Sequence, residues 1–267
     1  MSGEMSDEKP TRVLMALDCG VTDADAFRAV SLLTGEPELE VTGVYIEDED
    51  LINAARLPGI AEISTAGTVS ALDPDSVQSE LLQQAQHARQ TFETSARRMN
   101  FNYSFRVSRG RNVDILLEAA STSDIVVVNR PLRAAGLRTR RGSHFAPLLE
   151  HHGNLLFVNE PWASGRSVIA LCESPGVSSE RALAAAKRIA AAEDLEFLVA
   201  VPPQQRDEQG VDADRTLILT DWRESAIVDL CESEDARLLV LSATHLNWQA
   251  LLMGLIDRVS CSLLRLG

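Results

Sequence analysis

The amino-acid sequence predicts an α/β fold of two tandem, doubly wound, mostly parallel five-stranded sheets, of which the second is abridged. The first observation is a series of short apolar runs without polar alternation, which are typical of strands buried on both faces. The second is that helical patterns alternate with these runs, as in parallel βαβ units. The third is that the same order of patterns starts again after residue 166, which indicates an internal duplication.

The first unit is expected at residues 12–160, after a disordered tail at residues 1–11. Its expected strands are 12–17, 39–46, 102–107, 125–128 and 155–158. Its first expected helix is ended by Gly35 and Pro37, and its second runs from a cap at Asp75 or Ser76 to about Met99. Two further helices are expected at 113–121 and 144–152. The acidic run 47–50 is expected to be a solvated loop, and residues 51–75 to be irregular.

The second unit is expected at residues 167–267, after a linker at 161–166. Its expected strands are 168–173, 197–201, 216–220, 238–241 and 263–266, and its expected helices are 182–192, 226–230 and 251–259. Only residues 202–214 join its second and third strands, whereas residues 47–101 do so in the first unit. The second unit is therefore expected to lack the long second helix.

The composition argues against several classes of function. With 25 basic and 39 acidic residues, the formal net charge of −14 argues against general binding of nucleic acid or anionic membranes. No apolar stretch is long enough to span a bilayer, and the polar residues 1–10 do not resemble a secretion signal. The four cysteines are far apart, which favours reduced, mostly buried thiols in a cytoplasmic protein over a disulfide framework or zinc site.

A candidate anion site follows the buried run 125–128. Asn129 ends this run, and the next loop contains the five arginines Arg130, Arg133, Arg138, Arg140 and Arg141. Gly142 and Ser143 then open a helical pattern, where free N–H groups and the helix dipole favour a phosphate-sized anion. Ligands of open α/β sheets usually bind at the carboxyl ends of strands. The alternative is a solvated basic loop that balances an acidic surface.

These residues, together with Asp18 after the first strand and Gly110 after the third, resemble tandem universal stress proteins over nearly the whole chain from Arg12. ATP-binding members of that family carry a motif of Gly-x-x-Gly, nine residues, then Gly-Ser or Gly-Thr. Asn129 and Gly142 have the spacing of this motif, and Ser143 follows. The resemblance implies ATP, with Mg, in the first unit.

By this resemblance, Asp18 would lie near the adenine or ribose, Val44 would offer backbone contacts to the base, and Gly142 and Ser143 would meet the phosphates. Asn129 and Arg130 complete the candidate site, and the arginines can compensate for lost backbone contacts because guanidinium pairs bidentately with phosphate. Asp18 has an alternative role as the cap of the following helix.

The sequence departs from the family motif at both leading glycines. Asn129 and Leu132 stand in their places, and each adds a Cβ where the backbone would approach the nucleotide. In the second unit, Ser242 and Gly254 occupy the corresponding positions and Leu255 replaces the hydroxyl residue, so no nucleotide is expected there.

The expected function is therefore that of a cytoplasmic, universal-stress-type regulatory or adaptor protein with a degenerate nucleotide site in its first unit. The alternative is an ATP-binding, nucleotide-dependent switch. An ATP hydrolase has weak support, because no general base can be assigned. The edge strands 155–158 and 263–266 are expected to pair as an internal pseudo-dimer, which would pair again with a second chain; the protein partner is not identified. His144, His151 and His152 lack acidic or cysteine neighbours at metal-ligand spacing, so no metal is expected.

Overall fold

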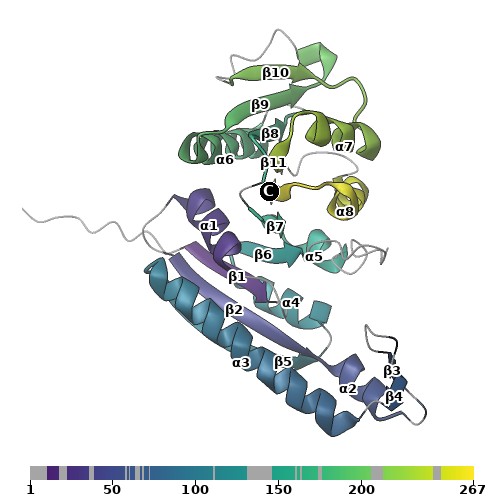
Figure 1. The fold of residues 1–267 in the computed structure, drawn as a ribbon. Helices are drawn as coiled ribbons and strands as arrows, with labels where there is room; N and C mark the ends of the chain where they lie inside the picture. Colours follow the sequence, from purple (N-terminus) through teal and green to yellow (C-terminus); the bar gives the residue numbers. More distant parts are fainter. Residues whose placement is uncertain are drawn as a thin grey trace, which may run out of the picture.

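The computed structural model folds the chain into one long sheet with helices on both faces (Figure 1). The structure describes residues 11–17, 23–35, 39–57, 59, 61–63, 67, 69–71, 73–110, 112–130, 146–159, 161–162, 164–173, 176–205, 213–242 and 248–267. The expected tail lies outside these residues, except that Thr11 already belongs to the first strand.

Ten strands form the sheet in the order β10-β9-β8-β11-β12-β7-β6-β1-β2-β5. Their bounds are β1 Thr11–Leu17, β2 Leu39–Asp48, β5 Asn102–Gly110, β6 Ile125–Arg130, β7 Leu155–Asn159, β8 Ser167–Leu171, β9 Glu196–Val201, β10 Arg215–Ile218, β11 Ala236–Ser242 and β12 Ser262–Leu266. Each half of this sheet contains five parallel strands, and its first strand in chain order lies at its centre. The predicted fold class is confirmed.

The two half-sheets join through β7 and β12, which pair antiparallel with Leu156 opposite Leu264. The predicted contact between these two edge strands is therefore confirmed. The pairing also changes the expected picture of two separate sheets, because it satisfies the edge backbone groups of both halves and merges them into one continuous sheet.

The strand registers relate the two halves by a local two-fold axis near Leu156 and Leu264. Equivalent rows across the two half-sheets are Ala16–Val128–Phe157 and Leu171–Leu241–Arg265. Asn129 is thus the structural equivalent of Ser242, and Glu173 stands two residues after Leu171, as Asp18 does after Ala16 in the sequence.

Seven helices pack against the two faces of the sheet (Figure 1). On one face lie α1 Asp23–Thr34, α3 Pro74–Arg98 and α6 Val177–Glu193, and on the other lie α4 Asn112–Ala120, α5 Ala146–His151, α7 Glu224–Ser233 and α8 Trp248–Arg258. Because both faces are covered, inner strands such as β7 and β8 are buried and apolar, whereas the edge strands β5 and β10 carry polar, exposed residues. The apolar side chains fill two extensive cores that run across both half-sheets.

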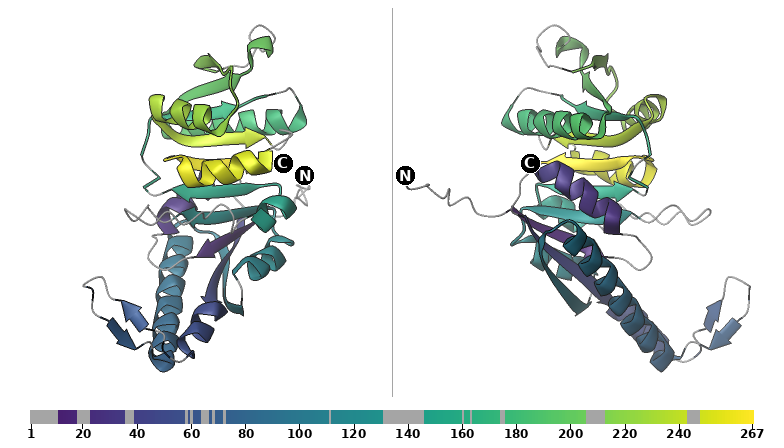
Figure 2. Two further views of the ribbon diagram at one scale, coloured as in Figure 1. Left: turned by 90° about the vertical axis from the view of Figure 1, so that its right-hand side faces the viewer. Right: turned by 60° about the vertical axis from the view of Figure 1, so that its left-hand side comes forward.

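The long helix α3 is specific to the first half. The views in Figure 2 show that it carries α2 Glu49–Ala55 and the hairpin of β3 Ala61–Ile63 and β4 Val69–Ala71 at its far end. The region 51–75, expected to be irregular, therefore contains regular elements. In the second half, the described residues between β9 and β10 contain only the 3₁₀ turn Pro203–Gln205, in agreement with the expected loss of the long helix.

Two further expectations are wrong. The N-cap of α3 is Asp73, whose carboxylate accepts a hydrogen bond from the backbone N–H of Ser76 at 3.0 Å, rather than Asp75 or Ser76. Glu47 and Asp48, expected in a solvated loop, belong to β2, and Glu47 is 5% exposed.

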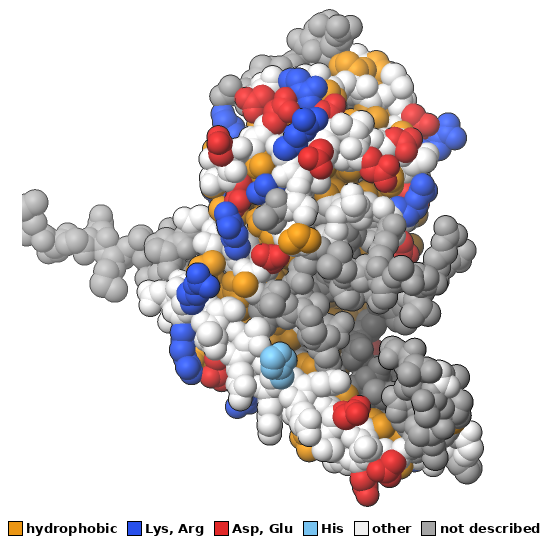
Figure 3. All heavy atoms as spheres, viewed as in Figure 1, with side chains coloured by type: hydrophobic (Ala, Val, Ile, Leu, Met, Phe, Trp, Pro, Cys, Tyr) orange, Lys and Arg blue, Asp and Glu red, His pale blue; other side chains and the backbone are white. Residues whose placement is uncertain are grey.

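Charges of both signs alternate over the second half on the face seen in Figure 3. Arg215, for example, forms salt bridges with both Glu196 and Glu234. None of the helices in the described part of the chain is long and apolar enough to cross a membrane.

Candidate functional site

The carboxyl ends of β1 and β6 lie side by side in the first half-sheet. Ala16 of β1 pairs with Val128 of β6, so the chain leaves both strands at the same edge of the sheet. Asp18 directly follows β1 in the sequence, but Asp18, Gly142 and Ser143 lie outside the described residues. The predicted nucleotide contacts of these three residues stay predictions.

Asn129 and Arg130 are the last two residues of β6, and their backbones pair with Val158 and Asn159 of β7. The position of the first leading glycine of the family motif is therefore held in regular sheet geometry. This arrangement places a Cβ at the end of the strand, where the motif would have open backbone.

Val44 lies inside β2, in register with Ala16 on one side and Arg106 on the other. Its side chain is fully buried in the core beneath α4. Since β1 ends opposite Tyr45 while β2 continues to Asp48, the segment 46–48 lies nearer to the candidate site than Val44 does. Sequence spacing alone did not reveal this difference in strand length.

An ion pair between a buried carboxylate and a half-exposed arginine lies at the same end of β2. Arg109 of β5 donates from Nε and Nη2 to Oε2 of Glu47 at 2.9 and 2.8 Å, and the Glu47 side chain is 7% exposed. Arg109 lies directly opposite Glu47 in the strand register. Because its carboxylate is paired in this way, Glu47 is suited to holding the strand ends together rather than to removing a proton from a substrate.

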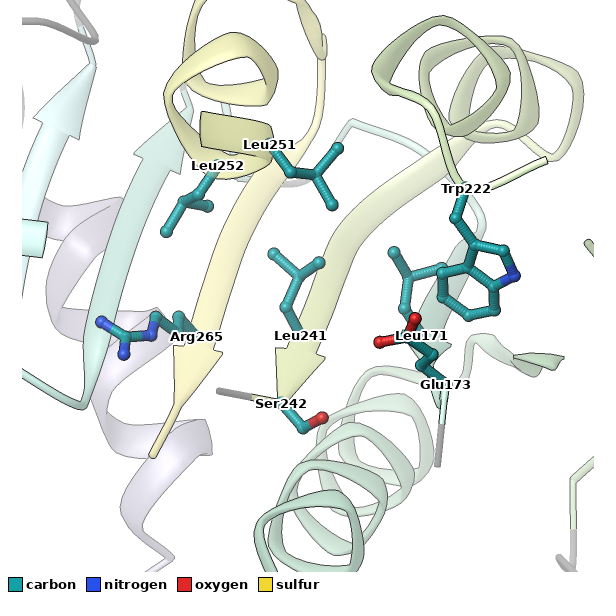
Figure 4. A pocket seen from close by; sticks show the side chains of 8 residues that line it. All are labelled: Leu171, Glu173, Trp222, Leu241, Ser242, Leu251, Leu252 and Arg265. Carbon is teal, nitrogen blue, oxygen red and sulfur yellow. The ribbon is translucent and has the colours of Figure 1, made fainter. Parts of the chain in front are cut away.

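The second half-sheet has a pocket at the equivalent edge (Figure 4). It is lined by Leu171, Glu173, Trp222, Leu241, Ser242, Leu251, Leu252 and Arg265. Ser242 is the equivalent of Asn129 in the strand registers, and Glu173 follows β8 in the sequence as Asp18 follows β1.

Apolar side chains dominate this pocket of the second half and leave space for little more than a water molecule. Figure 4 shows the Glu173 carboxylate beside the Trp222 ring, and the Arg265 guanidinium on the far side of β12 from that ring. Ser242 is buried and shares a 3.3 Å hydrogen bond with Ser179 of α6.

Gly254 lies in the interior of α8, and an added Cβ would fall 1.9 Å from the Glu224 carboxylate of α7. Its expected counterpart Gly142 lies outside the described residues, so the correspondence between the two stays a prediction.

Arg265 is a buried arginine at the seam between the half-sheets. It is 7% exposed, and its Nη1 donates hydrogen bonds to the backbone carbonyls of Leu149 and His152 at 3.1 and 2.7 Å. Burial lowers the pKa of its guanidinium to about 10, so the group stays charged at neutral pH. No sequence pattern pointed to this residue.

The described residues contain no group of three or more His, Cys, Asp or Glu side chains arranged to hold a metal ion. Cys172, Cys231 and Cys261 are buried free thiols, as predicted. A hydrogen bond with Cys261 and burial raise the pKa of the Cys231 thiol well above its ordinary value, which disfavours the reactive thiolate.

No family model matches the sequence, and no curated protein matches it either. A match among solved structures is a universal stress protein from Archaeoglobus fulgidus DSM 4304. The two are 11% identical, the match covers 95% of this chain and 94% of the other, and the TM-score is 0.63. The chain therefore shares the α/β fold of that protein over almost its entire length.

Proposed function

We propose that this protein is a cytoplasmic, tandem universal-stress-type regulator that acts as an adaptor for a protein partner. The observation that carries the proposal is the ten-stranded sheet, in which two equivalent half-sheets join through their fifth strands. The fold shared with a universal stress protein over 95% of the chain supports a stress-related role.

The residues at the two leading-glycine positions favour the adaptor role over nucleotide-dependent switching. Asn129 of β6, which pairs with Val158 of β7, replaces the first glycine, and Leu132 replaces the second. Backbone N–H groups that would cradle a phosphate lose their close approach when such side chains intervene. In this proposal the first-half site is degenerate, and the protein works without bound ATP.

The second candidate is a switch that binds ATP, with Mg, in the first half. The spacing from Asn129 to Gly142 and Ser143, together with the arginines from Arg130 onward, favours it. In this role, Asp18 and the end of β2 would hold the nucleoside while Gly142 and Ser143 hold the phosphates.

Isothermal titration with Mg-ATP distinguishes the two candidates. The adaptor role predicts no binding below millimolar concentration. Sub-millimolar binding that is lost in Ser143→Asp, whose carboxylate would repel the phosphates, would refute the adaptor role and support the switch. The control is Ser104→Asp, an exposed position near the amino end of β5, opposite to the carboxyl ends where the candidate site is expected, which adds the same charge.

We further propose that the internal pseudo-dimer pairs with a second copy of the chain. Sedimentation equilibrium tests this proposal. A mass of twice 29.1 kDa that falls on dilution is expected, and a mass of 29.1 kDa at all concentrations would contradict it.

A further inference from the structure

Four hydrogen bonds from three residues of the second half converge on the end of α5 and the turn that follows it. Arg265 donates to the carbonyls of Leu149 and His152, Gln249 of α8 donates to the Glu150 carboxylate at 2.8 Å, and the N–H of Gly267 donates to Oδ1 of Asn154 at 3.0 Å. The end of α5 is thus held by residues more than 90 positions away in the chain.

Two of the contacts at this turn have a counterpart across the local two-fold axis. The N–H of Asn159 donates to Oγ of Ser262 at 2.9 Å, as Gly267 donates to Asn154. The Asn159 side-chain amide donates to the carbonyl of Ser260, which is the position equivalent to His152. The turn after α8 is therefore held by a neutral amide.

The contact of Arg265 breaks this symmetry. Its equivalent is Phe157, which is fully buried and has no hydrogen-bond donor in its side chain. Arg265 also reaches one turn further into the helix than Asn159 does, because it binds the carbonyl of Leu149 as well as that of His152. At this pair of equivalent turns, therefore, the second half supplies a charged donor to the first half, whereas the first half supplies a neutral amide.

We propose that Arg265 is a positioning residue by which the second half fixes α5 and the following turn in the first half. The carbonyls at the C-terminal end of a helix carry partial negative charge and lack partners within the helix. A guanidinium held against them inside the protein forms charge-assisted hydrogen bonds that water does not weaken.

α5 is the first described element after residues 131–145, which include the predicted phosphate contacts Gly142 and Ser143. On this view, the second half has kept a supporting role while its own pocket has filled with apolar side chains. The effect on nucleotide binding rests on the proposed function, whereas the effect on α5 does not.

Amide hydrogen exchange on the full-length chain tests the proposal with Arg265→Met, which keeps the aliphatic stem and removes the donors. Exchange in the peptide 146–154 is expected to become about tenfold faster or more, while exchange in the equivalent peptide 254–262 stays unchanged. Arg265→Lys, which restores a positive charge and a donor, is expected to recover part of the protection and serves as the readout if Arg265→Met does not fold.

Arg237→Met is the matched control, because Arg237 is another mostly buried arginine that donates to a backbone carbonyl, that of Gly165. It is expected to lower the stability of the whole protein without a selective effect on peptide 146–154. Equal protection of that peptide in the wild-type protein and Arg265→Met would overturn the proposal. So would a loss in Arg265→Met that spreads uniformly over both halves.

Mg-ATP titration separates this proposal from the proposed function. If the wild-type protein binds Mg-ATP, Arg265→Met is expected to bind it about two- to thirtyfold more weakly, and equal binding would overturn the positioning role. If the wild-type protein binds none, the switch has failed, and hydrogen exchange alone decides the role of Arg265.

Discussion

Replacing Glu193 with Gln is expected to destabilise the protein. Glu193 of α6 accepts hydrogen bonds from Arg28 of α1 at 2.7 and 2.9 Å and from Arg237 of β11 at 2.9 Å. The side chains of Glu193 and Arg237 are 5% and 12% exposed, whereas that of Arg28 is 56% exposed. Removal of the carboxylate charge therefore leaves Arg237 buried without this counter-charge.

Breaking a buried ion pair from one side typically costs about 3–5 kcal/mol, whereas an exposed pair contributes less than about 1 kcal/mol. Because Arg28 is mostly exposed and Gln can still accept one hydrogen bond, the lower end applies, and we expect a loss of about 3 kcal/mol. For a chain of this size that corresponds to a fall in Tm of roughly 6–12 °C.

Urea unfolding followed by far-UV circular dichroism measures this loss from the midpoint and slope. Glu93→Gln is the matched control, because its i,i+4 pair with Arg97 joins side chains that are 28% and 66% exposed, and it should cost at most about 0.5 kcal/mol. A loss for Glu193→Gln below about 1 kcal/mol, or one equal to that of the control, would refute the reasoning.

Three further outcomes are expected. Gly165→Ala should lower Tm strongly, because Gly165 has φ +95° and an added Cβ would lie 2.6 Å from the backbone nitrogen of Arg237. The control Gly176→Ala should unfold near the wild-type temperature, because no atom lies within 4 Å of its added Cβ. Gly43→Ala should cost about 1–3 kcal/mol in chemical denaturation, because its Cβ would lie 2.8 Å from the Phe92 ring; an unchanged midpoint would show that the ring moves aside freely. The pKa of the Asp221 carboxyl, followed by carbon NMR, should lie below 3.8, because the backbone N–H of Arg223 donates a hydrogen bond to the carboxylate. Its contribution to stability is then present above pH 3.8 and lost on further acidification, and an ordinary pKa would contradict this.

The sequence could predict most of the elements because the signals for them are local. Runs such as 125–128 carry the β-branched character of a buried strand, and the strand at Ile125–Arg130 matches that run. The cap at Asp73 was also within reach, because Pro74 marks the first position of a helix and the cap precedes it. The pairing of the two edge strands followed from the family resemblance and from the need to cover unpaired backbone.

The candidate site could be predicted only in part, because it depends on which distant residues meet. From the sequence alone, the acidic run from Glu47 is expected to be a solvated loop, because the partner of Glu47, Arg109, lies 62 residues later in the chain. The two residues lie opposite each other only in the folded sheet. The spacing of Gly254 in the sequence likewise does not show that its backbone packs against Glu224 of α7. Such pairings are long-range, and charge or spacing along the chain does not determine them.

The sequence by itself determined the class of fold, the repeated order of strands and helices, and the apolar strands that need helices on both faces. Hydrophobic periodicity carries that information residue by residue. Only the tertiary structure decided the register in which β7 and β12 pair and that Arg265 reaches from one half to the helix of the other. Strand register and side-chain packing set these contacts, and both exist only once the chain has folded.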